Sequence, residues 1–103
     1  MITNLNESTF NDFMAQANNP VLVDYWAVWC APCRMMNPII NELAKELDGK
    51  VIFAKVDVDA NPVLSRELVS IPTIRVFINN FCIKEITGAK PKAVLLKELE
   101  ELL

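Results

Sequence analysis

Two cysteines separated by two residues, in the run Trp29-Cys30-Ala31-Pro32-Cys33, are the strongest chemical signal in this sequence. The run follows an apolar stretch typical of a strand and precedes a helical pattern, so Cys30 falls where a helix begins. Unpaired backbone N–H groups and the positive end of the helix dipole stabilise an anion at that position. The anion is a thiolate, the form that attacks disulfides, and Cys33 lies on the same helix face within reach. We therefore expect thiol–disulfide exchange, with Cys30 as the attacking thiolate and Cys33 as the resolving thiol.

The helix terminus also indicates the direction of the exchange. It stabilises a nearby anion by about 0.3–1 kcal/mol, and by up to about 2 kcal/mol where the site is partly buried. A strongly oxidising dithiol needs about 7 kcal/mol of thiolate stabilisation. A histidine between the cysteines could supply part of that, and the sequence contains no histidine. We therefore expect Cys30 and Cys33 to reduce protein disulfides.

Other uses of the cysteines stay open. A zinc site needs four ligands, and the chain has three cysteines and no histidine, so we expect no metal site within it. Metal binding would need Cys30 and Cys33 from two chains. The pair could also be inert, small buried residues. Cys82 is expected to be a small strand residue, and regulation by oxidation or dimerisation through it is the minority interpretation.

Length, charge and hydropathy limit the classes of function. The chain has 103 residues, which is typical of one domain, and a net charge of −3 with its basic residues scattered. A nucleic-acid-binding protein needs a basic face, and a polybasic membrane anchor needs clustered basic residues. No run approaches the roughly 20 apolar residues of a membrane span, and the N-terminus has no signal-peptide pattern. We therefore expect a cytoplasmic protein that binds neither nucleic acid nor membrane.

The apolar pattern predicts the elements that must hold the cysteines in place. Residues 21–27 are nearly all apolar, which is typical of a central strand buried on both faces, and Asp24 is their one polar interruption. After Cys33 the apolar residues recur every three or four positions, as in an amphipathic helix. Further strands are expected at residues 2–5, 51–58, 73–78 and 82–87, and further helices from Asn6, Asn61 and Pro91. Strands that alternate with helices and end in a hairpin predict an α/β domain.

Individual residue types predict where some elements begin and end. Asn61 and Pro62 are typical of the N-cap and first residue of a helix, and Pro91 of the first residue of another. Gly49 is expected directly after the last residue of the long helix, where positive φ is common. The pair Asn79-Asn80 is typical of a two-residue hairpin turn, because asparagine tolerates positive φ.

The sequence resembles the thioredoxin family over nearly its whole length. The similarity includes Val23-Asp24-Tyr25-Trp26-Ala27, Trp29-Cys30-Ala31-Pro32-Cys33-Arg34-Met35, Pro38, Lys55-Val56-Asp57, Asp59, Asn61-Pro62, Ile71-Pro72-Thr73 and Gly88-Ala89. One departure is Ala31, which stands where the family usually has glycine. The resemblance implies a single thioredoxin domain over residues 1–103. Its fold would be the thioredoxin fold, a central mixed five-stranded sheet flanked by four helices.

The resemblance also implies roles for two charged residues. Asp24 would lie behind the cysteine pair and help to deprotonate Cys33, directly or through water. Lys55 would be its charged neighbour. Burial of Asp24 should raise its pKa, because a desolvated carboxylate is disfavoured. The alternatives for Asp24 and Lys55 are a buried ion pair that serves the structure alone, or a charge at the edge of a strand.

A docking surface for substrates is implied in the same way. Pro72 resembles the family's cis-proline, and the backbone of Ile71 would pair with a bound substrate in extended form. An apolar patch would surround the exposed sulfur of Cys30. It consists of Trp29, Ala31, Pro32, Ile71 and Ala89, with Trp26 as a support behind the loop.

The resemblance finally implies partners. Protein disulfides would be the substrates, and a thioredoxin reductase would reduce the Cys30–Cys33 disulfide again. The chain has no nucleotide-binding glycine motif, so we expect no cofactor beyond that disulfide, and a monomer. The alternative function is a redox-independent binding or scaffold subunit that uses the same apolar patch.

Overall fold

The computed structural model describes all residues from Met1 to Leu103. Five strands form one sheet in the order β1-β3-β2-β4-β5, in which β1, β3 and β2 are parallel and β4 is antiparallel to both of its neighbours. The strands are β1 Ile2–Leu5, β2 Val21–Trp26, β3 Ile52–Asp57, β4 Thr73–Ile78 and β5 Phe81–Thr87. The helices are α1 Phe10–Gln16, α2 Ala31–Glu46, α3 Pro62–Ser65 and α4 Lys92–Glu100. The predicted mixed five-stranded sheet with four helices is therefore confirmed.

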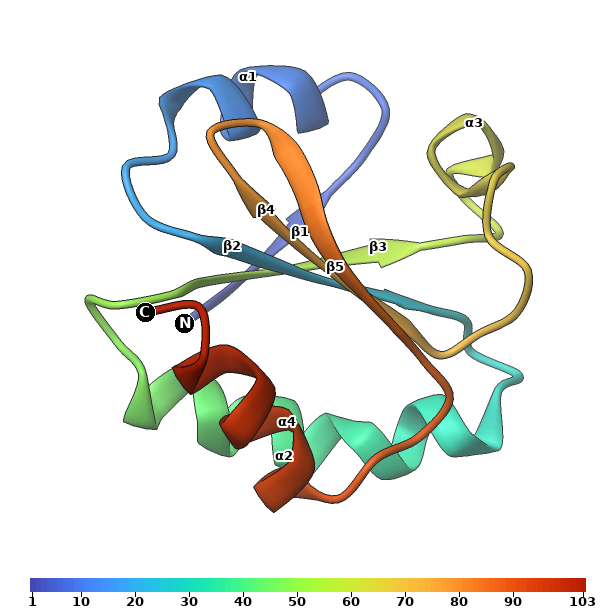
Figure 1. The fold of residues 1–103 in the computed structure, drawn as a ribbon. Coiled ribbons are helices and arrows are strands. Elements are labelled where there is room, and N and C mark those ends of the chain that lie inside the picture. The colour runs from blue at the N-terminus through green and yellow to red at the C-terminus, as the bar shows by residue number, and fades with distance from the viewer.

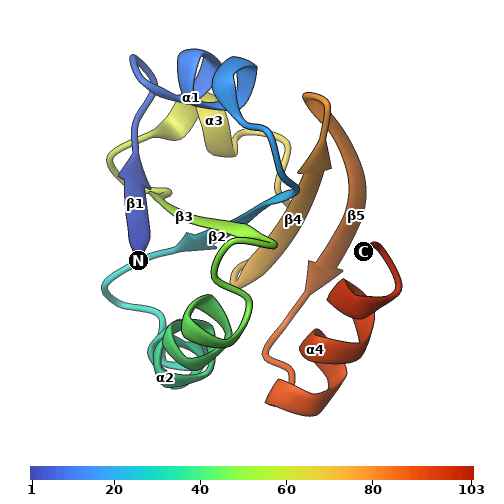
Figure 2. The ribbon, with the colours of Figure 1, turned by 90° about the vertical axis from the view of Figure 1, so that its left-hand side faces the viewer.

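The helices cover both faces of the sheet. Helices α1 and α3 lie on one side, and α2 and α4 lie on the other (Figures 1 and 2). This arrangement follows from the near-continuous apolar run of β2, because a strand in the middle of such a sheet must be buried on both faces. No helix of the protein has the length and apolar character needed to cross a membrane.

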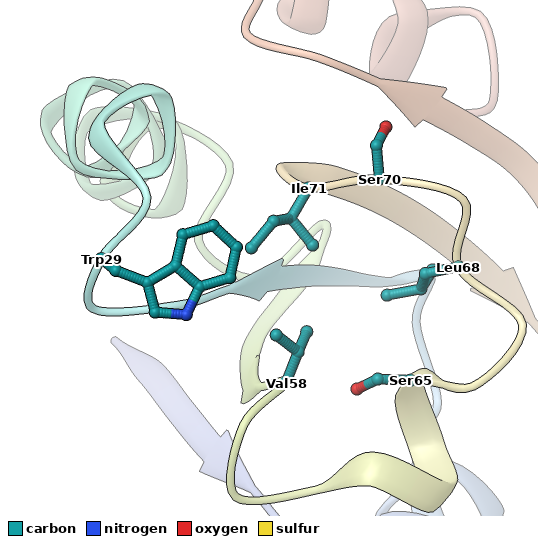
Figure 3. Close-up of a pocket in the computed structure, with 6 residues that line it drawn as sticks. All are labelled: Trp29, Val58, Ser65, Leu68, Ser70 and Ile71. Carbon is teal, nitrogen blue, oxygen red and sulfur yellow. The ribbon is translucent and has the colours of Figure 1, made fainter.

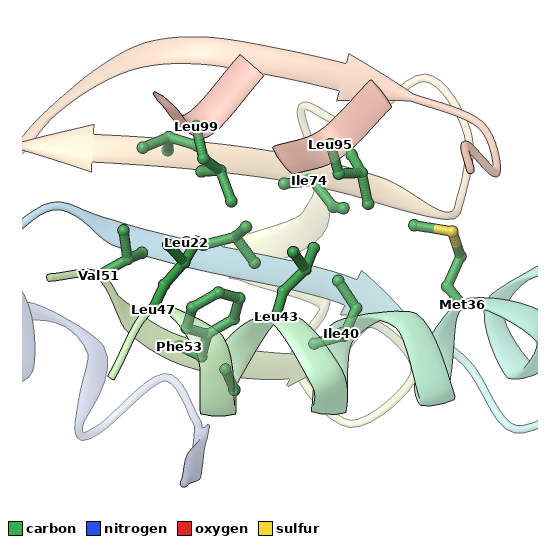
Figure 4. Packing of buried hydrophobic residues seen from close by; sticks show 12 residues of the cluster. Leu22, Met36, Ile40, Leu43, Leu47, Val51, Phe53, Ile74, Leu95 and Leu99 are labelled. Carbon is green, nitrogen blue, oxygen red and sulfur yellow. The ribbon is translucent and has the colours of Figure 1, made fainter. Parts of the chain in front are cut away.

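Alternate residues of β2 belong to two separate cores. Leu22 joins the cluster under α2 and α4, whereas Val23 and Tyr25 join the cluster under α1. The first cluster is drawn in Figure 4, where Ile40 and Leu43 of α2 point at the sheet. Because the alternation continues along the strand, Asp24 and Trp26 share the face of Leu22 and lie on the α2 side.

Several predicted boundaries differ from the structure. Helix α1 begins at Phe10 and not at Asn6, because the Asn6 side chain accepts from the backbone N–H groups of Ser8 and Thr9 and holds a turn instead. Pro91 was predicted as the first residue of α4, but it is the N-cap residue, so the helix begins one residue later, at Lys92. Strand β5 begins one residue earlier than expected, at Phe81.

Positive φ angles mark the predicted breaks. Asn79 and Asn80 have φ of 50° and 68° and form the turn between β4 and β5, as predicted. Gly49 has a φ of 81°. It stands two residues after Leu47, the C-cap of α2, and so lies one position later than expected.

Candidate active site

The two cysteines meet at the first turn of α2. Cys30 is the N-cap residue, with extended backbone, and its Sγ accepts a hydrogen bond from the backbone N–H of Cys33 at 3.2 Å. The two Cα atoms are 5.2 Å apart and the sulfurs are joined as a disulfide. Pro32 lies in the first turn, where its missing N–H leaves no partner unsatisfied. The predicted placement of Cys30 at a helix start, within reach of Cys33, is confirmed.

The cysteine pair is more deeply covered than expected. Cys30 retains 4% of its surface and Cys33 retains 1%, so the expectation of an exposed sulfur at Cys30 is wrong for this oxidised state. The cause is packing, because Val58 and Ile71 lie against the small cluster that the two cysteines form with Ala27. Cys30 therefore leaves only a small part of its surface accessible, and Cys33 leaves less.

Asp24 is buried without a partner. It has no exposed surface, and neither carboxylate oxygen accepts a hydrogen bond. Burial raises the pKa of Asp24 to about 6, and the positive charge of Lys55 opposes that rise. The side chain lies on the α2 side of the sheet, toward the helix whose first turn carries Cys33. The expected direction of the pKa shift is therefore confirmed.

Lys55 is a neighbour of Asp24 without being its ion-pair partner. The two residues stand opposite each other on β3 and β2. The Lys55 ammonium instead donates to Asn37 Oδ1 of α2 at 2.7 Å and lies 5.6 Å from the centroid of the Trp26 ring. The ion pairs of the structure all lie elsewhere. The alternative of a buried Asp24–Lys55 ion pair is therefore wrong.

The loop before β4 completes one wall of the site. The Ile71–Pro72 peptide bond is cis, as the resemblance implied, and Pro72 is buried. The Pro72 carbonyl accepts from the N–H of Gly88 at 2.8 Å. No backbone hydrogen bond of the structure uses Ile71. Its N–H and carbonyl therefore have no backbone partner within the protein.

Trp29 stands at the mouth of a hollow beside the cysteines. Its side chain is 67% exposed, and its indole Nε1 donates to Asp59 Oδ2 at 2.8 Å. The hollow has a volume of about 400 Å³, and the side chains of Trp29, Val58 and Ile71 converge on it (Figure 3). Its other lining residues are Ser65, Leu68 and Ser70.

The other three residues of the expected apolar patch lie in two different places along α2. Ala31 and Pro32 are exposed in the first turn of the helix. Ala89 is exposed as well, but it lines a second, smaller hollow together with Met35 and Ile39. The structure therefore places Trp29 and Ile71 together, and Ala89 on a separate surface along α2.

Sequence reasoning missed the far wall of the Trp29 hollow. Val58 ends an apolar run, and Leu68 fits a helical stripe, so both look like ordinary core residues in the sequence. Asp59 carries no local signal of its contact with Trp29, which lies 30 residues away.

Cys82 stands apart from this site. It is free and exposed on β5, and its Sγ lies 3.5 Å from the carbonyl of Lys84. Its place on a strand agrees with the expectation from the sequence. No group of three or more cysteine, aspartate or glutamate side chains is arranged to hold a metal ion.

A disulfide between Cys30 and Cys33 at a helix N-terminus defines a thiol–disulfide oxidoreductase. The family model described as Thioredoxin matches residues 1–101. The chain belongs to the thioredoxin family.

Individual relatives agree with this assignment. The chain is 45% identical over 101 residues to "Thioredoxin" of Mycolicibacterium smegmatis, which covers 94% of this chain and 90% of the relative. It is 39% identical over 97 residues to "Thioredoxin 1" of Nostoc sp., covering 92% and 91% of the two chains. It is also 46% identical over 97 residues to "Bifunctional thioredoxin reductase/thioredoxin" of Mycobacterium leprae. That match covers 92% of this chain and spans 21% of the bifunctional protein.

Proposed function

We propose that this protein reduces disulfides of other proteins through Cys30 and Cys33. The observation that carries the proposal is the hydrogen bond from the Cys33 N–H to Cys30 Sγ at the start of α2, at 3.2 Å. A backbone donor and the positive helix end both favour the thiolate of the reduced protein.

The reaction has two exchange steps. In the first, the Cys30 thiolate attacks one sulfur of a substrate disulfide. A bond to Cys30 forms, the substrate S–S bond breaks, and the leaving thiolate takes a proton. In the second, the Cys33 thiolate attacks Cys30 Sγ and releases the other substrate sulfur. The substrate gains two electrons and two protons, and Cys30 and Cys33 end as a disulfide.

Asp24 serves the second step as the acceptor of the Cys33 proton, directly or through water. Three observations support this role: the carboxylate faces the α2 side, its oxygens have no partner, and burial raises its pKa to about 6. A carboxylate with such a pKa accepts a proton more readily than an ordinary one near neutral pH. Lys55, through its charge, keeps part of the population ionised.

Substrates dock in extended form beside the cysteines. The unpaired backbone of Ile71 offers one donor and one acceptor to an incoming strand. Trp29 and the cis-Pro72 loop supply apolar surface beside it, and Ala31 and Pro32 add apolar surface at the first turn of α2. Ala89 offers further apolar surface along α2, apart from this hollow. Contacts of this kind accept many sequences, because backbone pairing and apolar burial demand little of a particular side chain.

The proposed partners follow from the family. A thioredoxin reductase reduces the Cys30–Cys33 disulfide again, and one relative carries both activities in its name. We further propose that the protein is a monomer that acts in the cytoplasm, where such reductases keep dithiols reduced.

Reduction of insulin disulfides by dithiothreitol tests the proposal. The protein should accelerate the reaction, and Cys30→Ser should abolish the acceleration. Cys33→Ser should accumulate a covalent complex with the substrate, because the second step is blocked. Cys82→Ser serves as the control and should retain full activity, since Cys82 stands apart from the site. Equal activity of Cys30→Ser and the unmodified protein would refute the proposal.

Exposure of Trp29 favours a second candidate, in which the patch holds a partner without redox chemistry. Replacing both Cys30 and Cys33 by serine separates the two functions. A reductase loses its activity in the double variant, whereas a scaffold still binds its partner.

A further inference from the structure

A chain of five hydrogen bonds connects the loop before α1 to the active-site wall. It begins at Glu7, whose carboxylate accepts from the backbone N–H of Val63 in α3 at 2.5 Å. The backbone N–H of Glu7 donates to Asn61 Oδ1 at 3.0 Å. Asn61 Nδ2 in turn donates to the carbonyl of Asp57, also at 3.0 Å. Glu7 therefore holds the segment that joins β3 to α3.

The chain ends at the active-site tryptophan. Asp57 Oδ1 accepts from the N–H of Asp59 at 3.0 Å, and Asp59 Oδ2 accepts from Trp29 Nε1 at 2.8 Å. The segment of residues 57–63 is thus anchored by Glu7 at one end and orients Trp29 at the other. Val58, which lines the Trp29 hollow, lies within this segment.

Asn61 is the junction of the chain. The sequence suggested that its side chain caps α3, but that side chain makes no such bond, and the Glu7 carboxylate caps the helix instead. Asn61 is 5% exposed, and both ends of its amide are paired. A buried amide with all its partners fixed tolerates little movement, because any shift leaves a polar group unsatisfied.

We propose that Glu7 is a positioning residue for Trp29. Through Asn61, Asp57 and Asp59 it holds the indole at the wall of the hollow on which protein substrates dock. The effect on turnover rests on the function proposed above, whereas the effect on Trp29 itself does not.

The rival explanation is that Glu7 acts locally, as the cap of α3. Leu64 and Leu68 pack against the core under α1 and could hold the segment without help from Glu7. Under that explanation, loss of the Glu7 carboxylate would disturb the first turn of α3 and leave Trp29 unchanged.

Exchange of the indole N–H with water, measured by NMR on the oxidised protein, tests the proposal. The two tryptophans give two indole signals, and Trp26 serves as the internal reference. Glu7→Ala should speed exchange at Trp29 about three- to tenfold, the range expected for loss of one hydrogen bond. The KM for insulin should rise by a similar factor, and by more than kcat falls. Glu7→Gln keeps a carbonyl acceptor. Its exchange rate at Trp29 and its KM should therefore stay close to those of the unmodified protein.

Glu100→Ala is the matched control. Glu100 is an exposed glutamate of α4 with no side-chain partner, so its loss should leave both measurements unchanged. If Glu7→Ala does not fold, Glu7→Asp gives a milder break, because it keeps the charge and shortens the side chain by one methylene.

A double-mutant cycle with Asp59→Ala shows whether the effect passes along the chain. Asp59→Ala removes the last link, so adding Glu7→Ala should not speed exchange at Trp29 further. Additive effects would refute the proposal. The proposal would also be refuted if Glu7→Ala speeds exchange at the Val63 and Leu64 amides but leaves the exchange rate of the Trp29 indole unchanged. Failure of the unmodified protein to reduce insulin would instead refute the proposed function, and the indole measurement would still decide the role of Glu7.

Discussion

At the scale of the residue, Asp24 has the least favourable surroundings for its charge. It is fully buried and unpaired, and its pKa is raised from 3.8 to about 6. Such a group lowers the stability of the folded protein whenever it is ionised. Its retention among apolar neighbours is explained by the chemistry proposed at Cys33.

This cost predicts a pH-dependent stability. Well below the unfolded pKa of 3.8, Asp24 is protonated in both states, and its charge then costs no stability. Between pH 4 and 6 the unfolded chain loses the proton while the folded protein keeps it, so the free energy of unfolding falls as pH rises. The total loss is about 3 kcal/mol and is complete above the folded pKa. Urea denaturation of the protein and of Asp24→Asn should therefore diverge by about that amount between pH 4 and 7. A difference that does not change with pH would contradict this prediction.

Asp24 also predicts a kinetic phenotype. Asp24→Asn should leave attack by Cys30 largely intact and slow release of the mixed disulfide, because asparagine cannot take the Cys33 proton. Stopped-flow measurement of both steps distinguishes them. In the unmodified protein the release step should slow as pH falls through about 6, the pKa of Asp24. Equal release rates in the two proteins would count against a role for Asp24.

The sequence predicted these residues unequally well. Cys30 and Cys33 were found from their spacing, which is a local signal. Asp24 stood out as a polar residue in an apolar run, and its role at the site was implied by the resemblance to the thioredoxin family. The contact of Asp59 with Trp29 and that of Glu7 with Val63 depend on elements far apart in the chain. No feature of the neighbouring sequence distinguishes the Asp59 or Glu7 carboxylate from one that is solvated.

At the scale of the element, the turn between β4 and β5 offers a second test. Both of its asparagines have positive φ, 50° at Asn79 and 68° at Asn80. Glycine adopts this conformation at lower cost, and Asn-Gly is the preferred pair for such a turn. Asn80→Gly should therefore raise the free energy of unfolding by about 0.5 kcal/mol.

Asn80→Ala provides the opposite control for this turn. Alanine resists positive φ and gains no local hydrogen bond, so it should destabilise the protein by about 1 kcal/mol. Urea denaturation at one pH measures both variants. A loss of stability in Asn80→Gly would show that the Asn80 side chain has a role beyond backbone conformation.

Element boundaries were predicted less well than the elements themselves. Helix α1 begins four residues later than expected, because Asn6 prefers to bond to its own backbone. Asn61 is the N-cap residue of α3 and Pro62 its first residue, as predicted, yet the capping hydrogen bonds come from the Glu7 side chain. Tertiary contacts override local propensity at such positions.

At the scale of the whole molecule, two cores share one sheet. Leu22 of β2 packs on the α2 side and Val23 on the α1 side, so loss of either core exposes the same strand. The two layers should therefore unfold together. The nearly continuous apolar run of residues 21–27 predicted that β2 is buried on both faces, but the order β1-β3-β2-β4-β5 depends on pairing between distant segments.

Leu43→Ala tests this coupling. Leu43 is fully buried between α2 and the sheet, so the substitution should cost about 3 kcal/mol. Far-ultraviolet circular dichroism and tryptophan fluorescence should still give coincident urea transitions. Leu103→Ala, at a half-exposed chain end, should change stability by less than about 0.5 kcal/mol. Two separated transitions in Leu43→Ala would show that the layers are independent.

The free peptide groups of Ile71 bear on which targets such a protein would choose. Backbone hydrogen bonding requires an incoming segment to be extended and depends little on its side chains. A target would have to straighten a few residues around its oxidised cysteine, and a disulfide locked inside a rigid helix or tight loop cannot do so. The preference among targets would then depend on how easily each target unfolds locally around its disulfide. Disulfides of damaged or partly unfolded proteins would be reduced before those of intact ones.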